Sequence, residues 1–300
     1  MERSKVKSLR LLIFFLGLIL SFTVFLGSFA ACGPAAYELN LMSFNIRWPI
    51  GEDIGFRNWT YRKEAVVEFL NDSGADIIGL QEIHTKREQL SYIEENLANK
   101  YEIIYFGDKE TNATIYDETK FNLISQEQYW LSETPDVQSI GWGETCYLAA
   151  GILMLEYKAT GDTIRVINTH GALGKDANVK GFELIAERSL SGENDPFTVM
   201  LGDFNAEPDE RGYVPIAEKL QDCRVSAKES PNRGYNTYNG WGKYPDDKPG
   251  ERIIDYCFVS KSENVEVLTY KVRADKWGDG HYISDHYAVQ ATVRIDNPND

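Results

Sequence analysis

The chain has 300 residues, with 46 Asp+Glu against 31 Lys+Arg and a formal net charge of −15. This length is enough for one large domain or two small ones, and no repeat or low-complexity stretch divides it. Proteins hold long duplex nucleic acid mainly by neutralising its phosphates with Lys and Arg, so the charge argues against duplex DNA or RNA as the principal substrate.

The N-terminus has the pattern of an export signal. Four basic residues lie within the first ten positions, and the apolar run Leu11–Phe29 follows. Ala30 and Ala31 then lead into Cys32, an arrangement that resembles a bacterial lipoprotein cleavage site. A run of this length can alternatively remain as a membrane-spanning anchor. We expect an exported protein of the cell envelope, lipid-anchored through Cys32 to a bacterial membrane.

Removal of residues 1–31 leaves residues 32–300, which we expect to form a single domain. The removed segment holds four basic residues and one acidic residue, so 27 Lys+Arg and 45 Asp+Glu remain, a charge of −18. Cys146, Cys223 and Cys257 are an odd number of cysteines without metal-ligand spacing, so at least one of these thiols is unpaired. Cys257 lies in an apolar run and is expected in the core.

The pattern along the chain alternates strands with helices at first and then becomes rich in strands. Thr160-Gly161-Asp162 has the composition of a hairpin turn. Strands are predicted at Leu39–Phe44, Ile77–Leu80, Glu102–Phe106, Phe121–Leu131, Ile152–Tyr157, Ile164–Thr169, Phe197–Leu201, Ile253–Val259, Val265–Val272 and Tyr287–Ile295. Helices are predicted at Tyr61–Asn71, Lys86–Asn99, Ala177–Ser189 and Val214–Leu220. Many strands with few flanking helices indicate two packed sheets with helices outside them.

Polar residues fall just past the apolar ends of four predicted strands. They are Asn45, Glu82, His170 and the pair Asp203 and Asn205. Loops at strand ends, held by a rigid sheet, are where catalytic groups usually lie. Taken singly, each residue has an ordinary explanation as a turn residue, a helix cap or a structural histidine. Four such strand ends together indicate a functional site.

Two later segments extend this set of polar residues. Asp285 and His286 precede the last predicted strand, and pairing with an antiparallel neighbour would bring its start to the same edge as the other strand ends. Asp255 lies inside a predicted strand between Ile254 and Tyr256, so its side chain leaves the opposite face from theirs. If that face meets His286, the role of Asp255 is to orient and charge the imidazole.

Six short motifs in this order resemble those of the endonuclease/exonuclease/phosphatase superfamily, which includes pancreatic deoxyribonuclease, neutral sphingomyelinases and inositol polyphosphate 5-phosphatases. The motifs are Ser43-Phe44-Asn45-Ile46-Arg47, Leu80-Gln81-Glu82, Asn168-Thr169-His170, Gly202-Asp203-Phe204-Asn205, Arg252-Ile253-Ile254-Asp255-Tyr256 and Ser284-Asp285-His286. One tripeptide is weak evidence, but six in order at strand ends are specific. Asn58-Trp59 with Arg62-Lys63, and the segment Trp130–Pro135, are further similar to an exported bacterial branch. The resemblance implies an α/β fold, a four-layer α/β/β/α sandwich of two mainly antiparallel sheets.

The resemblance also implies a divalent metal ion. Hydrolysis of an anionic phosphoester calls for a cation to neutralise developing charge and for donors on the phosphoryl oxygens. Glu82 is the natural oxygen ligand for Mg²⁺, or for Mn²⁺ in its place, and Asp285 is placed to bind the same ion or a second one. Asn45 is expected beside Glu82, either as a neutral metal ligand or as a residue that steers Asp203.

The other roles follow from the same resemblance. Asp203 positions and deprotonates the attacking water, while Asn205 and His170 bind the substrate by donating to its phosphate, next to Asn45. His286 is a second imidazole that faces the phosphate. Asp255 holds His286, and its carboxylate fixes the tautomer and supports the charged form.

Three segments depart from the bacterial branch, and we expect all three at the rim of the substrate pocket. They are Asn112–Thr114, Thr145–Leu148 and Gly171–Leu173. We therefore expect the reaction centre to match that of the bacterial branch and the substrate pocket to differ from it. Four aromatic residues either stack on a substrate at this rim or pack in the core: Trp48, Trp142, Tyr238 and Trp241.

The sequence predicts a metal-dependent hydrolase that cleaves a phosphate ester by metal-assisted attack of water. Small-molecule, sugar, inositol or lipid phosphoesters rank above nucleic acid because of the charge and the expected envelope location. The alternatives are a nuclease and a non-catalytic binding module that retains the fold. Such a module would be expected to lose Glu82, Asp203 or His286, and none of them is lost. The sequence predicts no oligomeric state.

Overall fold

The computed structural model describes residues 36–296 except 86–87, 108–109, 193–194 and 245–249. Ala36–Asp296 form one compact unit. Cys32 and the expected signal segment lie outside the described residues. Within the described part of the chain, no helix combines the length and the apolarity that crossing a membrane requires.

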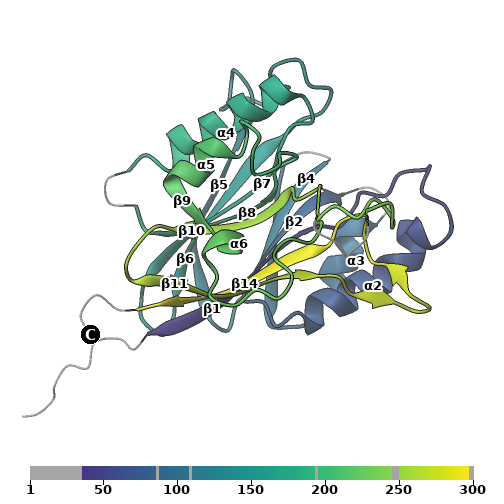
Figure 1. Cartoon of the computed structure of the whole chain (residues 1–300), viewed down its shortest axis with the longest axis horizontal. Coiled ribbons are helices and arrows are strands. Elements are labelled where there is room, and N and C mark those ends of the chain that lie inside the picture. Colours follow the sequence, from purple (N-terminus) through teal and green to yellow (C-terminus); the bar gives the residue numbers. More distant parts are fainter. Residues whose placement is uncertain (1–35, 86–87, 108–109, 193–194, 245–249, 297–300) are drawn as a thin grey trace, which may run out of the picture. The chain divides into compact units, whose positions relative to one another are not determined.

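Two six-stranded sheets form the body of this unit (Figure 1). The first has the order β11-β14-β1-β2-β4-β3 and the second the order β5-β6-β7-β8-β10-β9. The first sheet consists of β1 (Tyr37–Asn45), β2 (Ile77–His84), β3 (Tyr101–Phe106), β4 (Glu110–Asp117), β11 (Val265–Arg273) and β14 (Ala288–Ile295). The second consists of β5 (Phe121–Trp130), β6 (Ala149–Tyr157), β7 (Thr163–His170), β8 (Phe197–Asp203), β9 (Leu220–Asp222) and β10 (Asp255–Ser260).

The pairing within each sheet is mainly antiparallel, as predicted. β1 pairs with β2 in parallel, and β7 pairs with β8 in parallel. The other neighbours in the two sheets are antiparallel. Each sheet is therefore mixed, with one parallel pair near its centre.

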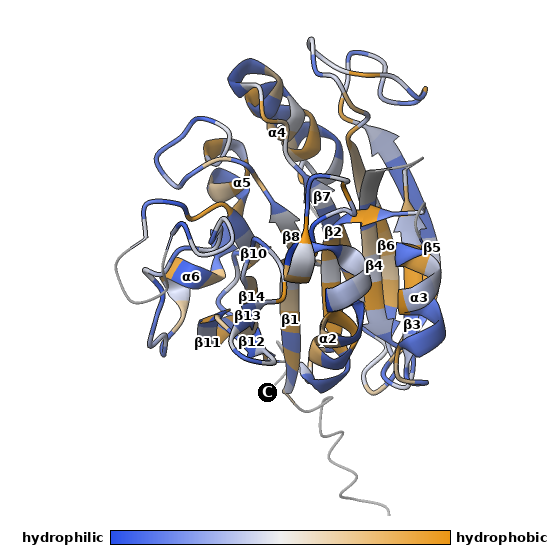
Figure 2. Cartoon of the chain, turned by 90° about the vertical axis from the view of Figure 1, so that its right-hand side faces the viewer, coloured by the Kyte–Doolittle hydropathy of each residue, from blue (hydrophilic) through white to orange (hydrophobic). Residues whose placement is uncertain are grey.

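The layers follow from the alternation of side chains along the strands. Along β1, Leu39 and Leu41 enter a core between the two sheets, whereas Met42 and Phe44 enter a second core on the outer face. The helices α2 (Trp59–Asp72) and α3 (Gln89–Asn96) cover that outer face, while α4 (Lys175–Ser189) and α5 (Val214–Lys219) cover the outer face of the second sheet. Figure 2 shows apolar residues along the strands and hydrophilic residues on the helices' outer sides. The predicted four-layer α/β/β/α sandwich is confirmed.

Every predicted strand and helix is present, with bounds shifted by a few residues. The helix expected at Lys86–Asn99 is shorter, since α3 spans Gln89–Asn96 and Leu97 is extended. The predicted hairpin turn joins β6 to β7, with Gly161 at a φ of 81°. Five short elements were not predicted, because they carry little periodic pattern: η1 (Gly55–Arg57), α6 (Cys223–Ser226), β9, β12 (Lys276–Trp277) and β13 (His281–Tyr282).

The longer strand β4 was not predicted either, and it corrects the expected position of Asn112–Thr114. This segment is not at the rim of a pocket, because Asn112, Ala113 and Thr114 are fully or almost fully buried within the first sheet. The strand was missed because it contains many polar residues, so it lacks the alternation of apolar residues by which strands are predicted. The cysteine predictions hold, since Cys223 and Cys257 are free thiols and Cys257 lies in the core between the sheets.

One edge of the sandwich collects the functional strand ends. The parallel pairs bring the carboxyl ends of β1 and β2, and those of β7 and β8, to this edge. The antiparallel partners β14 and β10 start at the same edge, because β14 runs against β1 and β10 runs against β8. Sheet topology therefore gathers six segments that are far apart in sequence, as expected from the strand pattern.

Candidate active site

Asp203, the last residue of β8, lies at the centre of the site. It stands opposite His170 of β7 and Asp255 of β10 in the second sheet. Its Oδ2 is 3.4 Å from His170 Nε2 and 3.7 Å from His286 Nε2, and its Oδ1 accepts from the backbone N–H of Asn205 at 2.9 Å. Burial alone would raise the pKa of Asp203, but the charge of His286 and the hydrogen bond with His170 hold it well below its usual range. Asp203 is therefore an ionised acceptor.

The first sheet contributes Asn45 and Glu82 beside Asp203. The amide of Asn45 donates to Glu82 Oε1 at 3.1 Å and to Asp203 Oδ2 at 2.9 Å, so it connects the two carboxylates. Its oxygen accepts from the backbone N–H of Arg47 at 2.9 Å. Glu82 Oε2 accepts from the backbone N–H of Trp48 at 3.0 Å. Of the two roles considered for Asn45, this arrangement favours steering Asp203.

His286 lies between two carboxylates. Its Nδ1 is 3.1 and 3.0 Å from the two oxygens of Asp255, and its Nε2 faces Asp203. Burial would lower the pKa of His286, but the charges of Asp255 and Asp203 raise it to about 10. Burial also raises the pKa of Asp255, whereas the charge of His286 lowers it and the charge of Asp203 adds to the rise. Strand β10 thus turns Asp255 toward His286, as its alternation predicted.

His170 and Asn205 form the opposite side of the site. Asn205 Nδ2 is 2.9 Å from His170 Nε2 and also donates to the carbonyl of Gly171 at 3.0 Å. Asn205 has a φ of 48°, an uncommon conformation that turns its side chain back toward β7. Burial would lower the pKa of His170, but the hydrogen bond and charge of Asp203 raise it. Both side chains line the pocket at this side.

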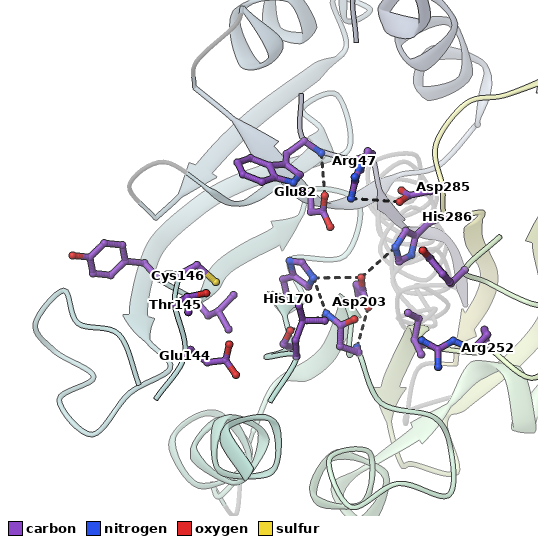
Figure 3. Close-up of a pocket in the computed structure, with 18 residues that line it drawn as sticks. Arg47, Glu82, Glu144, Thr145, Cys146, His170, Asp203, Arg252, Asp285 and His286 are labelled. Atoms are coloured by element: carbon purple, nitrogen blue, oxygen red, sulfur yellow. Dashed lines mark hydrogen bonds and ion pairs between the residues drawn. The ribbon is translucent and has the colours of Figure 1, made fainter. Parts of the chain in front are cut away.

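Asp285 lies beside Arg47 and near Glu82. Arg47 Nη1 is 3.5 Å from Asp285 Oδ2, and Arg47 Nε is 3.2 Å from Asp53 Oδ2. The hydroxyl of Ser284 donates to the Asn45 carbonyl at 2.7 Å and so ties the segment before β14 to the end of β1. All eight predicted site residues therefore lie within one region (Figure 3).

These groups open into a pocket with a volume of about 500 Å³. Glu144 and Cys146 stand on one side of the catalytic groups and Arg252 on the other (Figure 3). Glu144 Oε1 accepts from the backbone N–H of Gly174 at 2.8 Å, which ties two wall segments together. The departures at Thr145–Leu148 and Gly171–Leu173 do contribute to this wall.

Two of the four aromatic residues singled out from the sequence also line the pocket. Trp48 and Tyr238 are part of its wall, and the ring of Tyr238 meets that of His286 edge to face at 5.0 Å between centroids. Trp142 instead packs against the core of the second sheet. Trp241 lines a separate recess beside Arg57.

Comparison with known proteins agrees with this geometry. Residues 42–286 match the model of the Endonuclease/Exonuclease/phosphatase family. The chain belongs to this family. Proteins of this family hydrolyse phosphoesters, and the family is generally dependent on a divalent metal.

Two solved structures from Bacteroides thetaiotaomicron resemble this family member over most of its length. An endonuclease/exonuclease/phosphatase family protein has 26% identity and a TM-score of 0.79, covering 87% of this chain and 96% of that one. A mannosyl-6-phosphatase has 27% identity and a TM-score of 0.77, covering 85% and 99%. An uncharacterized protein of Acanthamoeba polyphaga mimivirus is 28% identical over 164 residues, which are 50% of this chain and only 60% of the viral protein.

The side chains of this family member fit a divalent cation at Glu82 and Asp285. Both carboxylates line the pocket, and hard oxygen ligands are what Mg²⁺ prefers. Burial raises the pKa of Asp285, and the charge of Glu82 adds to that rise, so a cation would relieve the repulsion between them. Asp203, Asp255 and His286 also bring ligand atoms within 4.8 Å of one another. Both nitrogens of His286 already face carboxylates there, so we interpret this group as a hydrogen-bonded array.

Three arginines were not predicted as site residues of this family member. Arg47 and Arg252 line the pocket, and Arg252 Nη1 is 3.3 Å from Glu207 Oε1. Arg62 is completely buried and donates to the backbone carbonyls of Arg57 and Ile46, among others. All three arginines occur within the quoted motifs without an assigned role. The signal that could have found them was electrostatic, since buried carboxylates need neighbouring cations.

Proposed function

We propose that this chain is a metal-dependent phosphoesterase that hydrolyses a small phosphate ester, with sugar phosphates foremost. The observation that carries the proposal is that the imidazoles of His170 and His286, an ionised Asp203 and the Glu82–Asp285 pair line one pocket. A volume of about 500 Å³ suits a small molecule. The similarity to a mannosyl-6-phosphatase supports a sugar phosphate.

The residues divide the reaction between them. His170 and Asn205 donate hydrogen bonds to the phosphoryl oxygens. The positive charge of His286 stabilises the negative charge that develops on these oxygens in the transition state. Asp203 accepts a hydrogen bond from the attacking water and aligns it with phosphorus. The P–O ester bond breaks as the new P–O bond forms. Asp203 takes a proton from the attacking water and later returns it to solvent, and the leaving alkoxide takes up a proton from solvent. Mg²⁺ or Mn²⁺, held by Glu82 and Asp285, would neutralise phosphate charge.

A panel of substrates tests this function. It should contain hexose 6-phosphates, inositol phosphates, a glycerophosphodiester, a chromogenic phosphodiester and duplex DNA, each with Mg²⁺, Mn²⁺ or chelator. We expect metal-dependent turnover that is highest on a small ester and lost in Asp203→Asn. Binding without turnover across the panel would instead support a binding module, and turnover confined to DNA would support a nuclease.

We also propose that the mature protein begins at an acylated Cys32, on the strength of the apolar run before Ala30-Ala31-Cys32. Cys32→Ser should block processing or release the protein from the membrane fraction, because the acyl chains supply membrane affinity. Fractionation and electrophoretic mobility of parent and variant measure this. Identical behaviour of the two proteins would rule out the lipoprotein.

A further inference from the structure

The direction in which Glu82 points depends on an irregularity in β2. The pairing of β2 with β4 shifts register between Gln81 and Ile83, which is a β-bulge at Glu82. Glu82 has a φ of 57°, in the left-handed region that residues other than glycine rarely adopt. A bulge re-aims a side chain, and such a conformation persists only where its surroundings hold it. Something must therefore fix the backbone on either side of Glu82.

The neighbouring Gln81 is fixed by a hydrogen bond to the other sheet. Its Nε2 donates to Asn168 Oδ1 of β7 at 2.8 Å and lies 3.2 Å from Ser43 Oγ. Asn168 Nδ2 in turn donates to the carbonyls of Leu80 at 3.0 Å and Ala113 at 2.8 Å, just before the bulge. Gln81 and Asn168 are both fully buried. One carboxamide from the second sheet thus holds two strands of the first.

Gly79 provides the space that Asn168 occupies. A Cβ at position 79 would lie 2.7 Å from Leu201 Cβ and 2.9 Å from Asn168 Oδ1. Real Cβ atoms do not approach so closely, and neither the core residue Leu201 nor the bonded Asn168 can readily move. The glycine therefore permits the close approach of the two sheets at this point.

Asn112 and Thr114 extend this arrangement along β4. Asn112 stands opposite Gln81, and its Nδ2 donates to the Ala149 carbonyl of the second sheet at 2.8 Å. Three oxygens here are buried and have no hydrogen-bond partner among the described residues: Gln81 Oε1, Asn112 Oδ1 and Thr114 Oγ1. Buried polar atoms are almost always paired, and ordered water is the usual partner where protein atoms supply none.

We propose that Gln81, Asn112, Thr114 and Asn168, the intersheet polar cluster, bind internal water and act as positioning residues for the reaction centre. The cluster couples Glu82, which follows Gln81, to His170, which lies two residues after Asn168. It therefore sets the distance between the metal ligand of one sheet and the phosphate donor of the other. The inference rests on the proposed function of Glu82 and His170, and it adds that the intersheet polar cluster aligns these two residues.

Gln81→Met tests the cluster, because it keeps the length of the side chain and removes its amide. The matched control is Gln290→Met, at a buried glutamine of β14 whose Nε2 donates to the Ser73 carbonyl at 2.9 Å. We expect Gln81→Met to weaken Mn²⁺ binding to the metal-free protein by about tenfold and to lower kcat by a similar factor. Gln290→Met should lower only the melting temperature. Mn²⁺ titration calorimetry, kcat and KM are measured on both variants.

The outcomes distinguish failure of the positioning role of the cluster from failure of the proposed function. If Gln81→Met lowers the melting temperature but leaves Mn²⁺ affinity and kcat within twofold of the parent, the cluster is only structural and the inference is wrong. If the parent hydrolyses no phosphoester, the proposed function fails, while Mn²⁺ affinity still tests the alignment of Glu82. Should Gln81→Met not fold, Thr114→Val replaces it as a smaller change, with reduced Mn²⁺ affinity expected. A high-resolution crystal structure without water at the three oxygens would overturn the water site.

Discussion

At the scale of single residues, the site is a balance of buried charges. Four carboxylates, those of Glu82, Asp203, Asp255 and Asp285, line or border a region that also holds the cations of Arg47 and His286 and the imidazole of His170. The surrounding carboxylates hold the imidazole of His286 charged and raise the pKa of His170, and the two imidazoles hold the pKa of Asp203 well below its usual range. Removing one member therefore changes the state of its neighbours as well as its own contact.

The two aspartates of this set should respond differently to metal. Asp255→Asn removes the carboxylate that bonds His286 Nδ1, so the imidazole loses its orientation and its charged form. Losses from such a change reach ~10⁴ in kcat in the serine-protease example, and added Mg²⁺ should not restore the rate. Asp285→Asn mainly weakens metal affinity, so high Mg²⁺ should restore a substantial part of the rate. Mg²⁺ titrations of kcat decide this, and rescue of Asp255→Asn alone would exchange the two roles.

The raised pKa of His286 predicts a specific pH dependence. A histidine whose folded pKa lies above its unfolded value near 6.5 stabilises the protein below that value, and this stabilisation is lost as pH rises through the folded pKa, about 10. In the metal-free protein, the His286 ring resonance should not titrate between roughly pH 5 and 8. NMR titration measures it, with His286→Gln for assignment, and Asp255→Asn should lower the midpoint. A midpoint near the ordinary value in the parent would contradict the charged His286.

At the scale of elements, helix α2 stabilises two segments of the site through hydrogen bonds of Arg62. The helix begins after Asn58, whose side chain accepts from the backbone N–H of Thr60 at 3.0 Å, and Arg62 lies on its buried face. Arg62 Nη1 donates to the carbonyls of Ile46 at 2.5 Å and Ile283 at 3.3 Å. Burial lowers the pKa of Arg62 to about 10, which leaves it charged at neutral pH. One side chain therefore joins the segment after β1 to the segment that carries Asp285 and His286.

Arg62→Met should accordingly be strongly destabilising. The change leaves several buried carbonyls without a donor, so we expect a loss of about 3 kcal/mol in the free energy of unfolding. Arg62→Lys should recover little, because an ammonium group cannot reach the same set of carbonyls. Arg165→Met is the control, since Arg165 is partly exposed and donates to the Ser189 carbonyl at 2.6 Å away from the pocket. Urea unfolding measures all three, and a lysine variant as stable as the parent would refute this role.

At the scale of the whole molecule, a strongly acidic body surrounds a small bounded pocket. The formal net charge is −15, and a protein with this charge repels extended polyanions. Local cations exist, since Arg47 and Arg252 line the pocket, and they suit one compact anionic group. The acidic body disfavours extended polyanions and the local arginines favour one compact anion, so both predict a preference for small phosphoesters.

Competition between duplex DNA and a small phosphoester tests this selection. At matched phosphate concentration and physiological salt, we expect the small ester to be hydrolysed at least about tenfold faster than the duplex. Duplex binding depends on counterions released when Lys and Arg neutralise the phosphates, and this protein has an excess of acidic residues. Lowering the salt should not reverse the order. Efficient cleavage of duplex at physiological salt would show that the acidic body does not exclude nucleic acid.

The sequence by itself indicated two packed sheets with outer helices and a set of polar residues at strand ends, for a physical reason. Alternating apolar residues define strands such as Leu39–Phe44, and a polar residue after a strand must lie at the edge of its sheet. The strand pattern therefore places Asn45, Glu82, His170, Asp203 and Asn205 at strand ends, and the parallel pairs β1–β2 and β7–β8 bring those ends to one edge. The face on which Asp255 leaves β10 followed from the same alternation.

Only the tertiary structure decided which groups contact one another and what holds them. β4 carries polar residues because it lies inside a buried network, so no local pattern revealed it, and Asn112–Thr114 were wrongly expected at the rim. Asn168 from the other sheet donates to the Leu80 carbonyl just before the bulge at Glu82, and Arg62 donates to the carbonyl of Ile283, far away in sequence. These are long-range hydrogen bonds between polar groups that have no periodicity. Local sequence encodes which face of a strand is apolar, whereas the partners of buried polar groups exist only once the sheets have packed.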